Sequence, residues 1–144
     1  MIFCSTKIGA DRLVYRLRKT RRDVTVIHGD LSQGQRDRAL EDFRRGRVRF
    51  LVATDVASRG LDIEGVSHVV NYDMPRDPNS YFHRIGRTGR AGATGIAVTL
   101  VSSREMPELK RIQNMSNIRI QKMVQTVPQL SNGRSINDPN TSRQ

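Results

Sequence analysis

The residues best suited to chemistry lie in an arginine- and glycine-rich loop that spans residues 83–90. Arg87 and Arg90 are separated by Thr-Gly, and glycines occupy positions 86, 89 and 92. Glycine lets the backbone approach a ligand closely and adopt positive φ angles. A compact cationic loop of this kind suits phosphoryl transfer, in which catalysis rests mainly on positioning and on charge stabilisation. The alternative interpretation is a solvated basic turn.

A second candidate site is the segment 53–63, which contains the end of an apolar run and two carboxylates. Thr54 and the neighbouring amides are suited to binding a phosphate at a helix N-terminus. Asp62 is a candidate acceptor for a ribose hydroxyl. Alternatively, Asp55 caps the turn and Asp62 pairs with a neighbouring arginine, so that neither carboxylate meets a ligand.

The charge of the chain favours a phosphate-rich partner. The sequence has a formal net charge of +11, with 25 lysines and arginines against 14 acidic residues, and 21 of the 25 are arginine. The arginine fork matches phosphate oxygens in a way that the point charge of lysine does not. We therefore expect a nucleic acid or a nucleotide as the partner, with a merely basic, solvated surface as the alternative.

Cysteine and histidine offer little for metal or redox chemistry. Cys4 is the only cysteine, which excludes an internal disulfide and a multi-cysteine zinc site. Its apolar neighbours predict a buried structural thiol. His28 and His68 have no companions at zinc-ligand spacing, so both are predicted to be structural and no metal site is expected. These features agree with a reducing intracellular setting, and we expect the cytoplasm.

The elements that position these residues alternate between strands and helices. Apolar residues at positions 10, 13, 14 and 17 have the spacing of one helix face. Ser32 and Gln35 form a capping-box pattern at the start of a second helix. Two more helices are predicted, one from Asp77-Pro78 through Ile85 and one from Ser102 to about Asn114; the predicted strands are 2–4, 24–27, 50–53, 66–72 and 95–101.

This alternation predicts an α/β fold, a parallel sheet with helices on both faces. Ligands of such sheets bind beyond the carboxyl ends of the strands. Small polar residues follow three of the predicted strands, in segments 5–7, 28–30 and 54–55. We therefore expect one functional edge.

The length of 144 residues fits one domain, which we place at residues 1–125. Residues 126–144 are rich in Pro, Asn, Ser, Gly and Arg and lack periodicity, which predicts a flexible polar tail. No membrane span and no signal peptide are expected.

Four segments together resemble, in order and spacing, the second-domain motifs of DEAD-box RNA helicases. The fold that this resemblance implies is the RecA-like C-terminal helicase domain. The similarity extends over residues 1 to about 125. The Ala-Ser-Arg-Gly-Leu-Asp and His-Arg-Ile-Gly-Arg-Thr-Gly-Arg sequences are closer to the DEAD-box branch than to other helicases. The four segments are residues 2–7, 33–36, 54–63 and 83–90.

The resemblance implies a role for each matching position. Arg87 and Arg90 match the γ-phosphate-contacting arginines, with Arg90 as the arginine finger, and Asp62 matches the carboxylate that meets the ATP ribose. Arg59, His83 and Arg84 match residues that organise the interface between two lobes. The RNA-backbone contacts match Ser5, Thr6, Gln33, Arg36, Thr54 and Gly60.

The implied activity is ATP-dependent RNA unwinding or remodelling. The chain lacks the phosphate loop, the Asp-Glu-Ala-Asp motif and the Ser-Ala-Thr motif of the family. The resemblance therefore implies a fragment whose partners are RNA, ATP and an N-terminal RecA-like lobe that holds most of the Mg²⁺ contacts. Two other hypotheses stay open, a free-standing RNA-binding module and a regulatory half-helicase without ATPase activity.

Overall fold

A computed structural model describes the chain except for residues 62, 64–65, 90–91, 117 and 124–144. Its centre is a five-stranded parallel sheet with the order β2-β3-β1-β4-β5. The predicted parallel α/β fold is confirmed, although the last two strands are shorter than the apolar runs that predicted them. The strands are β1 (Ile2–Cys4), β2 (Val24–Ile27), β3 (Phe50–Thr54), β4 (His68–Asn71) and β5 (Ile96–Thr99).

The helices begin where the capping signals predict. The Ser32 hydroxyl accepts a hydrogen bond from the Gln35 amide, and the Gln35 side chain accepts one from the Ser32 amide. The Asp77 carboxylate accepts from the Ser80 amide. The helices are α1 (Lys7–Leu17), α2 (Gln33–Arg44), α3 (Asp55–Ser58), α4 (Pro78–Ile85) and α5 (Met106–Ser116), with a 3₁₀ turn at Ser103–Glu105.

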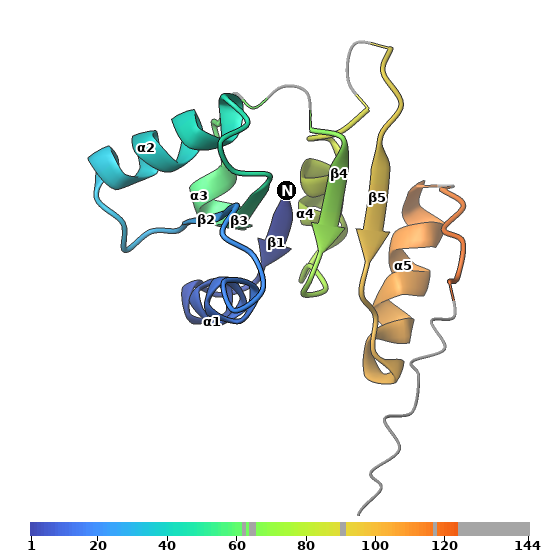
Figure 1. Cartoon of the computed structure of the whole chain (residues 1–144). Coiled ribbons are helices and arrows are strands. Elements are labelled where there is room, and N and C mark those ends of the chain that lie inside the picture. Colours follow the sequence, from blue (N-terminus) through green and yellow to red (C-terminus); the bar gives the residue numbers. More distant parts are fainter. Residues whose placement is uncertain (62, 64–65, 90–91, 117, 124–144) are drawn as a thin grey trace, which may run out of the picture.

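Helices α1 and α2 cover opposite faces of the sheet. Successive side chains of a strand point to opposite faces. On β3, Val52 packs in the cluster that holds Leu13 of α1, whereas Leu51 packs in the cluster that holds Leu40 of α2. Figure 1 shows α1 below the sheet and α2 and α3 at its upper left. The prediction of helices on both faces is therefore confirmed.

The carboxyl ends of β2, β3 and β1 share one edge because these strands are parallel neighbours. The polar segments 5–7, 28–30 and 54–55 follow these ends, so the predicted edge exists. We call it the strand-end edge. The arrowheads in Figure 1 point toward it. The predicted tail at 126–144 lies outside the described residues. Within the described part of the chain, no helix has the length and apolar character to cross a membrane.

Candidate functional site

The short helix α3 is the centre of the candidate site. It follows β3 directly, with Thr54 at its N-cap position and no hydrogen bond from the Thr54 side chain to the helix. The Ser58 hydroxyl donates to the Asp55 carbonyl at 2.9 Å. Gly60 then has a φ of 72°, which favours glycine because a side chain disfavours this region. The chain therefore turns sharply at the strand-end edge.

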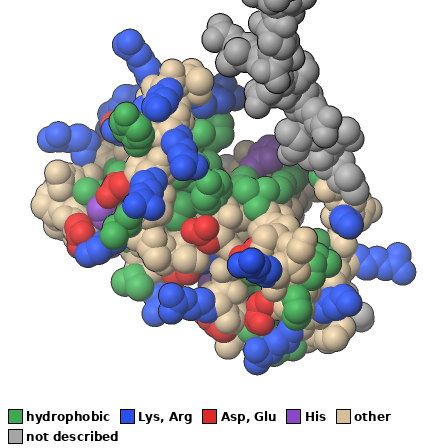
Figure 2. Space-filling model, turned by 90° about the horizontal axis from the view of Figure 1, so that it is seen from below, with side chains coloured by type: hydrophobic (Ala, Val, Ile, Leu, Met, Phe, Trp, Pro, Cys, Tyr) green, Lys and Arg blue, Asp and Glu red, His purple; other side chains and the backbone are tan. Residues whose placement is uncertain are grey.

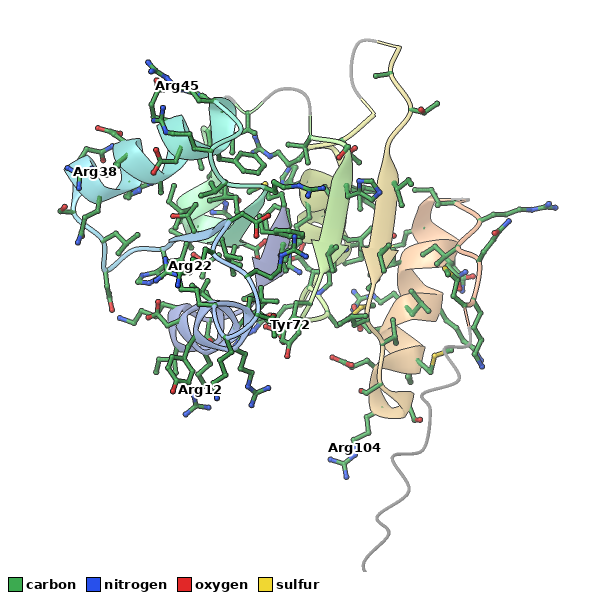
Figure 3. The ribbon with its side chains drawn as sticks, in the orientation of Figure 1. Arg12, Arg22, Arg38, Arg45, Tyr72 and Arg104 are labelled. Carbon is green, nitrogen blue, oxygen red and sulfur yellow. The ribbon has the colours of Figure 1, made fainter. Side chains whose placement is uncertain are left out.

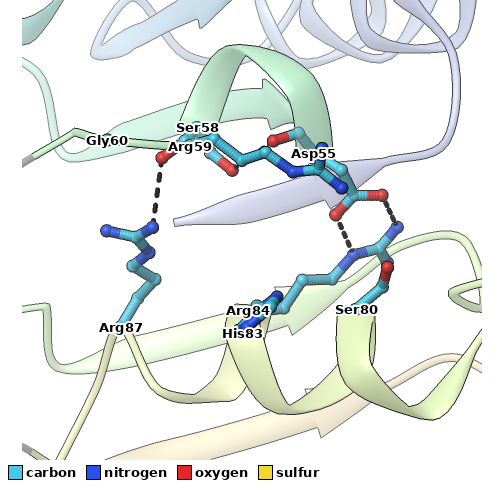
Figure 4. Close-up of a pocket in the computed structure, with 8 residues that line it drawn as sticks. All are labelled: Asp55, Ser58, Arg59, Gly60, Ser80, His83, Arg84 and Arg87. Atoms are coloured by element: carbon cyan, nitrogen blue, oxygen red, sulfur yellow. Dashed lines mark hydrogen bonds and ion pairs between the residues drawn. The ribbon is translucent and has the colours of Figure 1, made fainter.

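Arg84 of α4 holds the first residue of α3. Its Nε and Nη2 donate to the two carboxylate oxygens of Asp55, both at 2.7 Å. Its Nη1 donates to the Asp73 carbonyl at 2.7 Å and to Asn71 Oδ1 at 3.3 Å. The guanidinium also lies 5.3 Å from the centre of the Phe3 ring. Figure 4 shows this fork between α4 and α3.

These contacts correct the interpretation of Asp55 as a cap of the turn. Its carboxylate binds Arg84, and Thr54 takes the N-cap position. Arg84 is 1% exposed and donates to Asp55, Asn71 and Asp73 of this domain, so its side chain has almost no surface for a second lobe. The signal was present in the sequence. Arg84 follows Tyr81 by three residues, on the inward face of α4, where a charged side chain requires a buried partner.

Two further arginines contact the carbonyls at the end of α3. Arg87 donates from Nη1 to the Leu61 carbonyl at 2.6 Å and from Nη2 to the Ser58 carbonyl at 3.2 Å. Arg36 of α2 donates from Nη2 to the Ala57 carbonyl at 3.4 Å. The Arg36 Nε is buried and forms no hydrogen bond among the described residues. The end of α3 and the turn after it are thus contacted by one arginine from α2 and one from the loop after α4.

A pocket of about 190 Å³ lies between α3 and α4. It brings together five of the predicted site residues: Arg59, Gly60, His83, Arg84 and Arg87. Arg59 and His83 are exposed, while Arg87 is partly buried. The Asp55 carboxylate is engaged by Arg84, and the other polar side chains of the lining are arginine, histidine and serine. The pocket is therefore chemically suited to an anionic ligand. The remaining lining residues are Asp55, Ser58 and Ser80.

The other predicted contacts lie along the strand-end edge and at the start of α2. Ser5 and Thr6 are exposed; the Thr6 hydroxyl caps α1 by accepting from the Gly9 amide at 3.0 Å. The exposed Gln33 donates to Asp37 at 2.7 Å. Figure 2 views the molecule from below, toward this edge, and shows lysine and arginine side chains around acidic ones. Asp62 and Arg90 lie outside the described residues.

Histidine and cysteine have structural contacts. His28 is 4% exposed; its Nδ1 accepts from the Asp30 amide at 3.3 Å, so its Nε2 donates to Asp11 at 3.0 Å. Cys4 is fully buried, and burial raises the pKa of its thiol to about 12. His68 is exposed and lies beside the Ser67 hydroxyl. No group of three potential ligands for a metal ion is found among the described residues.

The sequence interpretation missed two residues that complete the site. Asn71 is fully buried at the end of β4, where its amide oxygen accepts from Arg84 and its amide nitrogen donates to Thr99. Asp73 supplies a carbonyl to Arg84 and a carboxylate to the Ser5 amide at 2.8 Å. Asn71 ends β4 and Asp73 follows it, so the rule that ligands bind at the carboxyl ends of strands is the signal that identifies them.

Known proteins share the sequence pattern and the fold of this chain. Residues 1–92 match the family model described as the helicase conserved C-terminal domain. The DEAD-box ATP-dependent RNA helicase CshA of Geobacillus kaustophilus is 49% identical over 123 residues, which are 85% of this chain and 26% of that protein. The chain thus spans about a quarter of the length of this curated relative.

Two solved structures are also similar. A DEAD box protein from Methanococcus jannaschii superposes with a TM-score of 0.80 at 42% identity, covering 85% of this chain and 34% of that chain. Dbp5 of S. cerevisiae, solved bound to RNA and ADP BeF3, has a TM-score of 0.76 at 43% identity. This match covers 82% of this chain and 32% of that one. The RecA-like fold expected from the resemblance is confirmed.

Proposed function

Since the chain belongs to the helicase conserved C-terminal domain family, as the C-terminal domain of a DEAD-box RNA helicase, we propose that it binds RNA at the strand-end edge and completes an ATP site with a second lobe. The observation that carries this proposal is the position of α3. Arg36, a proposed RNA contact, and Arg87, a proposed ATP contact, both donate to carbonyls of the short segment 57–61.

The ATP half of the proposal assigns Arg87 and Arg90 to the γ-phosphate and Asp62 to the ribose. Arg87 supports it because it lines the pocket beside the exposed side chains of Arg59 and His83. Preorganised arginine donors stabilise charge that develops on a transferring phosphoryl group. The described pocket offers no cluster of free carboxylates, so Mg²⁺ is assigned mainly to the second lobe.

In this scheme, nucleotide binding would first change the hydrogen bonds of Arg87. Its Nη1 and Nη2 are bonded to the Leu61 and Ser58 carbonyls in the lobe alone. A γ-phosphate, with its negative charge, is a stronger acceptor than a neutral carbonyl. Arrival of the nucleotide would therefore draw guanidinium donors from the turn at Gly60 and change how firmly this turn is held. We assign Arg59 and His83 to contacts with the second lobe, and Arg84 to positioning α3.

The RNA half assigns backbone contacts to the exposed edge. Contacts to phosphate and sugar carry no sequence code, so binding should be indifferent to base sequence. Contacts to 2′-hydroxyl groups would give a preference for RNA over DNA. The parent activity is then ATP-dependent unwinding or remodelling of RNA, in which two lobes close on one strand. The proposed contacts are Ser5, Thr6, Gln33, Arg36, Thr54 and Gly60.

An ATPase assay tests the shared site. The chain alone, with saturating RNA, should release no phosphate at a useful rate, because groups that hold the β-phosphate and Mg²⁺ belong to the other lobe. Fused to a matching N-terminal helicase lobe it should become active. In that fusion, Arg90→Ala should lower turnover about a thousand-fold or more, whereas Arg134→Ala should have almost no effect. Equal, small losses would overturn the arginine-finger assignment.

A further inference from the structure

A basic stripe lies on the outer face of helix α1 and on the turn that follows it. It is formed by Arg12, Tyr15 and Arg16 of the helix and by Lys19, two residues past the helix end. Arg12, Tyr15 and Arg16 have i, i+3 and i+4 spacing, so they share one side of the helix, and Lys19 contacts Tyr15 on that side. Each of them is exposed, Tyr15 by 68%, whereas Leu13 on the other side of α1 is buried against the sheet. The stripe is therefore a surface feature with no packing role in the sheet.

The positive charge of the basic stripe is not neutralised. Asp11 of α1 is bonded to His28, and Lys7 takes up Asp30 at 2.8 Å. Among the described residues, no carboxylate forms an ion pair with the three cations of the stripe. The Lys19 ammonium lies 5.0 Å from the centre of the Tyr15 ring, which leaves the other ring face open to a planar group. Exposed cations beside an exposed aromatic ring are typical of surfaces that bind single-stranded nucleic acid.

The basic stripe also lies next to the strand-end edge. Helix α1 begins at its cap Thr6, one of the proposed RNA contacts, and its 11 residues span about 16 Å at 1.5 Å per residue. Figure 3 shows Arg12 projecting away from the sheet, on the side to which the strands point. A strand that leaves the edge at Thr6 can therefore continue along α1.

We propose that the basic stripe binds RNA that extends past the strand-end edge, with phosphates on Arg12, Arg16 and Lys19 and one base stacked on Tyr15. This inference rests on the proposed function, because RNA must first occupy the edge. The RNA site would then be longer than the one formed by the proposed contacts of the strand-end edge. The added part lies on a surface that contains none of those contacts.

The test compares two variants of the full chain with equal loss of charge. One is R12Q/R16Q/K19Q, and the control is R104Q/K110Q/R111Q, which changes three exposed cations in and just before α5. Glutamine is a good helix former, so both should fold, which circular dichroism checks. Each protein is titrated with unstructured single-stranded RNA of about 6 and about 12 nucleotides, which are lengths within the range of single-strand binding sites.

The wild type and the control should bind the longer strand more tightly than the shorter one. The stripe variant should lose this gain in affinity, which we expect to be about tenfold at 0.1 M salt. The slope of the logarithm of its binding constant against the logarithm of salt should fall by about 2 on the longer strand, because three lost phosphate contacts contribute about 0.7 each. Tyr15→Ala should lose a smaller part of the gain, about fivefold, because one base is no longer stacked.

The outcomes separate the two proposals. If the wild type binds neither strand, the proposed RNA function fails, and this inference with it. If the wild type binds both strands but the stripe variant matches the control, only the basic stripe is excluded. If the stripe instead binds polyglutamate and adds nothing to RNA affinity, its partner is an acidic protein and the RNA assignment is overturned.

Discussion

Arg84 is the residue on which the site depends, and the reason is its burial. A guanidinium that is 1% exposed is stable only if its donors are satisfied, because an unpaired buried charge is strongly disfavoured. The acceptors come from two segments, Asp55 at the start of α3 and Asn71 with the Asp73 carbonyl at the end of β4. Arg84 therefore fixes the start of α3 relative to the end of β4, and through α3 the position of the turn at Gly60.

Removing this fork should destabilise the fold. We expect Arg84→Met to lower the free energy of unfolding by about 3–5 kcal/mol, since the partly buried Asp55 loses its partner. Arg84→Lys should also be destabilising, because an ammonium cannot bond both carboxylate oxygens as a planar fork does. Arg59→Met, an exposed change in the same pocket, should stay within about 0.5 kcal/mol. Urea unfolding measures all three, and equal losses for the two methionine variants would refute a structural role of the fork.

Cys4 makes the free energy of unfolding depend on pH in the alkaline range. Burial, followed by the nearby Asp73 charge, raises the pKa of its thiol to about 12, with Arg84 opposing. In the unfolded chain the pKa of the thiol is about 8.5. Between these values the unfolded chain has lost the proton that the folded chain keeps, so the Cys4 contribution makes the free energy of unfolding fall as pH rises.

Two measurements check the state of Cys4. A thiol-reactive dye at pH 8 should label the native chain very slowly and the chain in urea quickly. The alkaline fall in stability should be smaller for Cys4→Ala, which lacks the titrating group. Rapid labelling of the native chain, at the rate seen in urea, would show that the thiol is accessible and that the raised pKa does not apply.

The helices show which parts of the secondary structure can be predicted from local sequence patterns. Capping residues predicted the starts of α2 and α4 because their hydrogen bonds are local, between residues three apart. Helix α3 was predicted only as a turn, since four residues are too short for a periodic pattern. Its contacts come from Arg36, Arg84 and Arg87, up to 29 residues away in sequence. Such long-range contacts cannot be read from the local pattern.

Alanine substitutions of two glycines, Gly60 in the turn after α3 and Gly34 in α2, should have opposite effects on stability. Gly60→Ala should lower the free energy of unfolding by about 1–2 kcal/mol, because φ is 72° and alanine is disfavoured there. The cause is backbone strain alone, since, apart from the adjoining residues, no atom of the described part of the chain lies within 4 Å of the added Cβ. Gly34→Ala, inside α2 and equally open, should stabilise by about 0.4–1 kcal/mol. Thermal unfolding of both variants compares them; a stabilising Gly60→Ala would mean that the turn differs from the one described.

At the scale of the whole molecule, topology brings the parts of the site together. The parallel order of β2, β3 and β1 places three polar segments on one edge, and this could be predicted from alternating strands and helices. The contacts of Arg36 and Arg87 with one short segment could not. They arise because α2 and the loop after α4 each direct an arginine to carbonyls of residues 57–61. Only the packed fold shows that Arg36 and Arg87 share this segment.

The net charge of +11 leads to the last prediction, which concerns how RNA binding depends on salt and sequence. Cations that neutralise phosphates release counterions, so the logarithm of the binding constant should fall linearly with the logarithm of salt, by about 0.7 for each phosphate contacted on a single strand. Contacts to phosphate and sugar do not distinguish bases, so unrelated sequences of equal length should bind within a few-fold of one another. Fluorescence anisotropy with three unrelated RNA strands and one DNA strand, each at two salt concentrations, measures both properties. RNA should bind more tightly than DNA of the same sequence, because 2′-hydroxyl contacts are lost in DNA. Strong preference for one sequence with a shallow salt slope would instead indicate readout of base edges, which is incompatible with an edge that contacts only the backbone.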